Sequence, residues 1–103
     1  MTTKHTPGPW ITDSKERTDT ARYIMAAARP FPHTIARIDL TNRAEDEANA
    51  ALIAAAPELL EALNREQEWR DREAVGALDE EWDYETMVGQ YRRAAIAKAE
   101  GRQ

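Results

Sequence analysis

The chain has 103 residues, with 14 Lys and Arg against 19 Asp and Glu, which gives a formal net charge of -5. This length allows a single small domain over residues 1–103 and excludes two. Hydrophobic residues make up 42% of the chain, but 19 of them are alanines, which leaves 24 larger apolar side chains. Because such a chain has little to bury alone, we expect a homo-oligomer, a dimer or higher.

The absence of cysteine excludes a disulfide framework, a thiol nucleophile and a thiolate metal site. It fits a reducing compartment. The N-terminus lacks an apolar signal region, and no window approaches the roughly 18 consecutive apolar residues of a spanning helix. We therefore expect a cytosolic protein that does not enter a membrane.

Charge is unevenly distributed along the chain. Residues 1–43 hold seven Lys or Arg and four Asp or Glu, whereas residues 44–103 hold seven and fifteen. The first part is therefore basic (+3) and the second acidic (-8). The overall acidity argues against binding of extended duplex nucleic acid, but a local basic cluster can still hold a small anion.

The strand-rich part is predicted over about residues 8–40. Pro7-Gly8-Pro9 prevents a helical start. Three short runs rich in β-favouring residues follow, namely Trp10–Thr12, Arg22–Ala26 and Thr34–Leu40. Together they predict a three-stranded antiparallel meander. In the third run the alternation places Ala36, Ile38 and Leu40 on one face and Ile35, Arg37 and Asp39 on the other.

A helix is predicted over about residues 43–74. Asn42 followed by Glu45 is a capping-box pattern. Pro57 interrupts the pattern and must either kink the helix or begin a new one; we favour a kinked continuous helix. The expected apolar stripe consists of Ala48, Leu52, Ala55, Ala56, Leu59, Leu60 and Leu63.

A second helix is predicted over about residues 79–100, after a break at Gly76 and with Asp79 or Asp83 as its cap. Its inward face is expected to carry Tyr84, Met87, Val88, Tyr91 and Ala95. The predicted fold class is α+β, a short antiparallel meander followed by a two-helix antiparallel hairpin.

No residue pattern indicates an enzyme. His5 and His33 lie 28 residues apart with no carboxylates at metal-ligand spacing, so we expect no metal site. Ser14 is the only serine and lacks a nucleophile motif, and the four glycines are too isolated for a phosphate-binding loop. We expect neither catalytic residues nor a cofactor.

Arginines and aromatic residues are interleaved in the strand-rich part. Guanidinium groups pair with phosphate and aromatic faces stack on bases, so this composition suits a small nucleotide. The candidates are Trp10, Arg22, Tyr23, Arg29, Phe31 and Arg37. The alternative, which we call the ordinary interpretation, is that these residues bind no ligand. In it the arginines lie on a solvent-facing strand surface and the aromatics belong to the core between sheet and helix.

A second candidate cluster is Tyr91-Arg92-Arg93, whose alternative role is charge compensation at the end of a helix. Asn49 is a further candidate, either for reading a base edge or for a structural hydrogen bond. Alanines on adjacent faces of the first helix are strong helix formers, and they also allow two helices or two subunits to approach closely.

Two segments resemble a widespread group of small proteins encoded by bacteriophages and prophages. They are His5-Thr-Pro-Gly-Pro-Trp10 and Asn49-Ala-Ala-Leu-Ile-Ala-Ala-Ala-Pro-Glu-Leu-Leu-Glu-Ala-Leu63. With the Ile-Ala-x-Ile strand between them, the match extends over about residues 5–64. The resemblance implies a phage origin, a common α+β module and, for most members, no assigned function.

In outline the chain is also similar to the sponge-type phage inhibitors of bacterial immunity. That resemblance implies sequestration of a cyclic nucleotide or cyclic ADP-ribose signal at subunit interfaces, without cleavage, in the cytoplasm of the infected host. It is one of architecture rather than of matched residues. It makes a nucleotide-sequestering counter-defence protein our first hypothesis.

The rival hypothesis is an acidic interaction protein that docks on a host or phage protein and inhibits it. The helical part supplies the carboxylates for this role. This hypothesis includes mimicry of the charge of nucleic acid by these carboxylates. They are Glu66, Glu68, Asp71, Glu73, Asp79, Glu80, Glu81 and Asp83.

Overall fold

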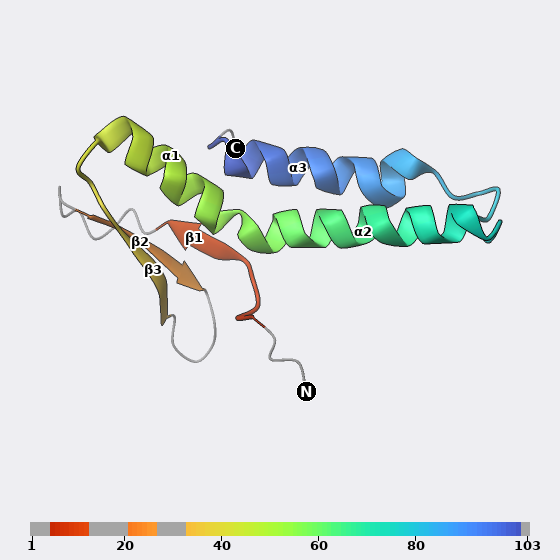
Figure 1. The fold of residues 1–103 in the computed structure, drawn as a ribbon, viewed down its shortest axis with the longest axis horizontal. Helices are drawn as coiled ribbons and strands as arrows, with labels where there is room; N and C mark the ends of the chain where they lie inside the picture. Colours follow the sequence, from red (N-terminus) through yellow and green to blue (C-terminus); the bar gives the residue numbers. More distant parts are fainter. Residues whose placement is uncertain (1–4, 13–20, 27–32, 102–103) are drawn as a thin grey trace.

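The computed structural model describes residues 5–12, 21–26 and 33–101 (Figure 1). Within these ranges a three-stranded antiparallel sheet precedes the helices, so the fold class is α+β. The strands are β1 (Trp10–Thr12), β2 (Ala21–Ala26) and β3 (His33–Asp39), in the order β1-β2-β3. The predicted meander is confirmed.

A bulge changes the predicted faces of β3. Ile24 of β2 pairs with Ala36, but the next residue, Met25, pairs with Thr34, so Ile35 has no partner of its own. The extra residue turns the strand, and Ile35 packs on the same core cluster as Ala36 and Ile38. The prediction that Ile35 faces away from these two residues was wrong because simple alternation assumes an unbroken register.

The first helix, α1 (Arg43–Ala54), begins as the capping pattern predicts. Asn42 is the N-cap, and its side chain accepts a hydrogen bond from the Glu45 backbone N–H. Asp46, rather than Glu45, accepts from the backbone N–H groups of Thr41 and Asn42, at 2.8 and 2.9 Å. These bonds to its charged form lower the pKa of Asp46.

The expected continuous helix is two helices. After α1 a single residue, Ala55, intervenes before α2 (Ala56–Ala74). Pro57 lies in the first turn of α2, where its missing N–H costs nothing. Our preference for a kinked continuous helix was therefore wrong, and the two-helix hairpin is not matched in detail, since three helices follow the sheet.

The second helical segment begins later than predicted. Asp79 accepts from the Glu81 N–H and stabilises a turn, while the helix starts at Tyr84 after Asp83, whose carbonyl accepts from the Met87 N–H. The segment contains a π-helix, η1 (Glu85–Gly89), that continues into α3 (Gln90–Ala99). We call residues 84–99 together the returning helix. The predicted start at residue 79 was wrong because a polar side chain can cap a turn as readily as a helix. Of the two caps that the sequence offered, Asp83 is the one that directly precedes the helix.

The helices extend the molecule away from the sheet. Figure 1 shows α1 beside the sheet, α2 running away from it, and α3 returning alongside α2 to reach α1. An ion pair of 2.7 Å between Lys98 and Glu58 joins the last turn of α3 to the first turn of α2. No helix in the described part of the chain is long and apolar enough to cross a membrane.

The core between sheet and α1 is built mainly from small side chains. Ile24 packs with Ala50 and Ala54, and Trp10 and Ile53 lie against this cluster. The only large side chains that are fully buried among the described residues are Ile24 and Val88.

The predicted apolar stripe of the first helix is only partly buried. Ala48 is exposed, and Leu52 and Leu63 are 52% and 68% exposed. The sheet and α3 instead approach the faces that carry Ala50, Ala54 and Ala62, because small residues permit closer contact. On the returning helix Val88 and Ala95 are buried as expected, while Met87 and Tyr91 remain partly exposed.

The N-terminal segment is held against the start of α2. A Cβ added to Gly8 would lie 2.8 Å from Cβ of Pro57, which is closer than side chains pack. The two segments that carry the phage resemblance therefore touch each other at Gly8 and Pro57, and Trp10 continues the contact onto α1. Their shared role in the fold is this close approach.

We expect Gly8→Ala to destabilise the protein, because the added methyl group meets a rigid proline ring. Overpacking of this kind costs about 1 to 3 kcal/mol, measurable by urea unfolding. Gly89→Ala is the control, since its Cβ meets the flexible carboxylate end of Glu85, which can move aside. Equal stability of the Gly8→Ala variant and the unmodified protein would contradict the contact.

Candidate functional site

The arginines of the sheet are paired within the chain. Arg22 forms an ion pair of 2.8 Å with Glu47 of α1. Arg37 lies 3.1 Å from Asp39 and 6.0 Å from the centre of the Tyr23 ring. These contacts agree with the ordinary interpretation of this cluster better than with an open phosphate site.

Two further candidates from this region, Arg29 and Phe31, lie outside the described residues. Asn49 is exposed on α1, and its side chain makes no hydrogen bond to another described residue. The described part of the chain therefore gives no support to a structural hydrogen bond of the Asn49 side chain.

Trp10 combines a core contact with a place in an open groove. Its Nε1 donates to the Thr6 carbonyl at 3.2 Å, and its ring packs on the core cluster. One side lines a groove of about 620 Å³ between β1, α1 and the end of α3, together with Ala51, Ala54 and Lys98. The cation in this groove, Lys98, is already paired with Glu58.

Tyr91 and Arg93, from the second predicted cluster, also have partners. The Arg65 guanidinium lies 3.6 Å from the centre of the Tyr91 ring, a close cation–π contact. Arg93 forms an ion pair with Glu85, which raises the pKa of the arginine and lowers that of the carboxyl. Neither the Tyr91 ring nor the Arg93 charge is fully available to a ligand.

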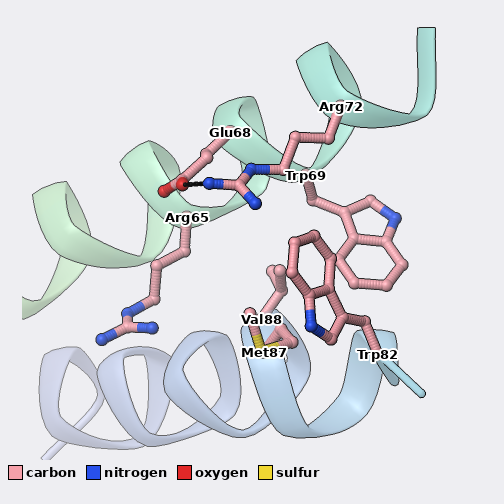
Figure 2. A pocket seen from close by; sticks show the side chains of 7 residues that line it. All are labelled: Arg65, Glu68, Trp69, Arg72, Trp82, Met87 and Val88. Atoms are coloured by element: carbon pink, nitrogen blue, oxygen red, sulfur yellow. Dashed lines mark hydrogen bonds and ion pairs between the residues drawn. The ribbon is translucent and has the colours of Figure 1, made fainter. Parts of the chain in front are cut away.

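An aromatic cluster that the sequence analysis missed joins α2 to the returning helix. Figure 2 shows Trp69 and Trp82 pointing toward one another beside Val88, with Arg72 next to them. Arg72 lies 4.8 Å from the centre of the Trp82 ring. The cavity among these residues has a volume of only 30 Å³, room for about one or two water molecules.

This cluster is therefore a structural connection rather than a ligand pocket. Trp69 also meets Tyr84 edge to face, with 5.5 Å between ring centres. The spacing of Arg65, Trp69 and Arg72 along one helix is a weak sequence signal for it, because the partners Trp82 and Tyr84 come from a later part of the chain.

Arg92 is placed differently from the other predicted arginines. It lines an open groove between α2 and α3, which we call the α2–α3 groove, with a volume of about 490 Å³. The groove is lined by Leu59, Ala62, Leu63, Glu66, Arg70, Arg92 and Ile96. The Arg92 side chain forms no hydrogen bond or ion pair with another described residue, although its charge helps to lower the pKa of Glu66 through space.

Glu66 is the acceptor in this groove. The Tyr84 hydroxyl donates to its Oε2, and Arg70 lies 3.0 Å from its Oε1. The tyrosine hydrogen bond, followed by the contact with Arg70, lowers the pKa of Glu66, so the carboxylate stays ionised at neutral pH. The groove thus offers one carboxylate, two guanidinium groups and an aliphatic floor.

One described residue of each predicted cluster lines a groove, and the two grooves are separate. Trp10 lies where β1 meets α1, whereas Arg92 lies between α2 and α3. Of the predicted site residues that the structure describes, Arg92 fits an open anion site best, and Arg70 and Glu66 join it.

Metal ligands do not gather in the described ranges. Within residues 5–12, 21–26 and 33–101, no group of three or more His, Asp or Glu side chains could hold a metal ion.

The sheet and helices define an α+β protein whose open groove is lined with arginines. Comparison with known families identifies the chain as a phage protein: the profile of the family described as Salmonella phage P22 protein Y8K6 matches residues 1–103, so the chain belongs to that family. No curated protein and no solved structure matches the chain.

We expect Tyr84→Phe to raise the pKa of Glu66 toward that of an ordinary glutamate, because the main hydrogen bond to the carboxylate is lost. A lowered pKa stabilises the fold at pH values above the ordinary value, and this contribution disappears as the pH falls through the folded-state pKa. Carboxyl NMR titration measures the change. Tyr91→Phe is the control, and an unchanged Glu66 titration in Tyr84→Phe would contradict the assignment.

Proposed function

We propose that this phage protein is a counter-defence protein that binds a small nucleotide signal of the host and sequesters it without cleavage. It acts in the cytoplasm of the infected bacterium as a homo-oligomer, with the ligand held at a subunit interface. Its membership of a phage protein family supports this setting.

The composition of the α2–α3 groove supports a nucleotide as the ligand. Its volume of about 490 Å³ lies within the range of small-molecule sites, roughly 300 to 1,000 Å³. Leu59 and Ala62 provide an aliphatic surface for a base. Ionised Glu66 can accept from the exocyclic amine of that base, and Arg92 can pair with phosphate, while Arg70 is held at 3.0 Å by Glu66.

The observation that carries the proposal is the Arg92 guanidinium, which has no direct hydrogen-bond or ion-pair partner among the described residues. Arg93, its neighbour, is neutralised by Glu85, and Arg65 is stacked on Tyr91. Among the described arginines, Arg92 alone lines an apolar groove without such a partner, and it acts on Glu66 of the same groove only through space. A phosphate is a natural partner for such a group because its oxygens match the guanidinium fork.

Arg92→Ala is expected to weaken nucleotide binding by about 10- to 100-fold, the effect of losing a charge-assisted contact of about 1.5 to 3 kcal/mol. Thermal shift and calorimetry with a panel of cyclic dinucleotides and cyclic ADP-ribose isomers measure it. Arg93→Ala is the matched control and should retain binding. The bound ligand should return intact after denaturation.

A protein that shows no shift with any ligand of the panel, or that returns a cleaved ligand, would overturn the proposal. Equal losses for Arg92→Ala and Arg93→Ala would assign the effect to general charge rather than to the groove.

A second candidate is the acidic interaction protein, which the distribution of charge favours. Residues 71–83 form the last turn of α2 and the connection to the helix that starts at Tyr84, at the end of the molecule farthest from the sheet (Figure 1). Six exposed carboxylates lie here with a single arginine, and none of the six forms an ion pair with another described residue. They are Asp71, Glu73, Asp79, Glu80, Glu81 and Asp83.

This candidate predicts a stoichiometric protein partner and indifference to nucleotides. Neutralising Asp79, Glu80, Glu81 and Asp83 to their amides should release a partner captured from infected-cell lysate, while Arg92→Ala should leave it bound. Persistence of the partner on the amide variant would exclude the acidic end as the docking surface.

A further inference from the structure

An exposed aliphatic surface continues from the floor of the α2–α3 groove. We call it the leucine face, formed by Leu59, Leu60 and Leu63 of α2 and Ile96 of α3. Leu60, Leu63 and Ile96 are 43%, 68% and 38% exposed. Contiguous apolar surfaces bordered by charged residues are typical of sites that another molecule covers.

The rest of the chain explains why this surface lacks a cover. The radius of gyration is 16.7 Å, whereas a globular domain of this length has one of about 13 Å. The helical half is drawn out along a molecule 53 Å long, and Val88 is its only large side chain that is fully buried. Nothing in the described chain folds back over Leu63.

Charge distinguishes a second copy of this chain from other occupants. The leucine face is bordered by Glu66 as well as by Arg70 and Arg92. A two-fold contact places the same surface against itself, so a border with both signs can meet opposite charge.

The long axis fixes the direction in which the copies lie. The sheet and the acidic residues 71–83 lie at opposite ends of the molecule (Figure 1). Antiparallel copies keep the two acidic ends apart. A parallel pair would set the two acidic ends together, within the range of about 8 to 10 Å over which charges still repel in salt.

We propose that the leucine face binds the leucine face of a second copy, in an antiparallel two-fold dimer. The contact covers Leu63 and closes the open side of the α2–α3 groove, so each ligand site is completed by the partner. This completion rests on the proposed function, whereas the dimer itself does not.

The mass of the protein without nucleotide tests the interface. Sedimentation equilibrium should give twice the chain mass of 11.7 kDa. Leu63→Glu should give the monomer with unchanged helix content by circular dichroism. Val75→Glu is the matched control, because Val75 is 77% exposed but lies outside the leucine face, and it should remain dimeric.

A protein that remains monomeric at about 100 μM, which places the dissociation constant above that concentration, would overturn the proposal. So would an assembly whose mass Leu63→Glu does not reduce, or one that Val75→Glu dissociates equally.

Single cysteines test the direction of the two copies, because the natural chain contains none. Under mild oxidation Leu63→Cys should form a disulfide-linked dimer, since the residue lies near the two-fold axis. Val75→Cys should not, because the acidic ends lie far apart. The reverse result would overturn the antiparallel arrangement even if Leu63→Glu fails to fold.

These measurements separate the dimer from the function. A dimer that binds no nucleotide would contradict the proposed function and leave the interface intact. A monomer that binds nucleotide through Arg92 would contradict the interface and leave the function intact.

Discussion

Close approach between small side chains is the constraint on which the rest of this structure depends. Gly8 lies against Pro57, and Ala50 and Ala54 lie against Ile24. These contacts hold the N-terminal segment, the sheet and α1 together without large residues. They also bury little apolar area, and burial of such area is the main favourable term in folding. Because alanine and glycine make these contacts, leucines such as Leu60 and Leu63 remain exposed.

Packing and ion pairing assign most of the predicted site residues to the structure rather than to a ligand site. Trp10 belongs largely to the close-packed part, since its ring lies on the core cluster. Arg22, Arg37 and Arg93 are neutralised by Glu47, Asp39 and Glu85. Arg92 remains, beside the aliphatic floor of the α2–α3 groove. The proposed site therefore rests on one predicted residue and on Arg70 and Glu66, which only the packing of two helices brings to it.

Local chemistry was sufficient to predict the strands and the first helix start. Prolines, β-branched runs and the Asn42 cap act within a few residues, so their effects can be read from neighbouring positions. Prediction was wrong where the same local sequence is compatible with two different structures. Pro57 permits either a kink or a new helix, and Asp79 caps a turn instead of a helix. Ile35 was misplaced because a bulge depends on the neighbouring strand.

Contacts between helices could not be predicted in this way. The stacking of Arg65 on Tyr91 and of Arg72 on Trp82 needs the register of α2 against the returning helix. Charge patterning alone treats these arginines as partners of Glu61 and Glu68, which they also are. The distinction between Arg92 and Arg93 likewise follows from the π-helix, which carries the Glu85 that neutralises Arg93.

The proposed assembly depends on a second copy that covers the leucine face. Methyl NMR spectra recorded on dilution detect this cover, because each methyl group reports its own surroundings. The signals of Leu59, Leu60, Leu63 and Ile96 should shift as the dimer dissociates, while those of Val75 and of exposed Leu52 stay in place. Signals of the leucine face that do not change with concentration, or shifts confined to Leu52 and Val75, would contradict it.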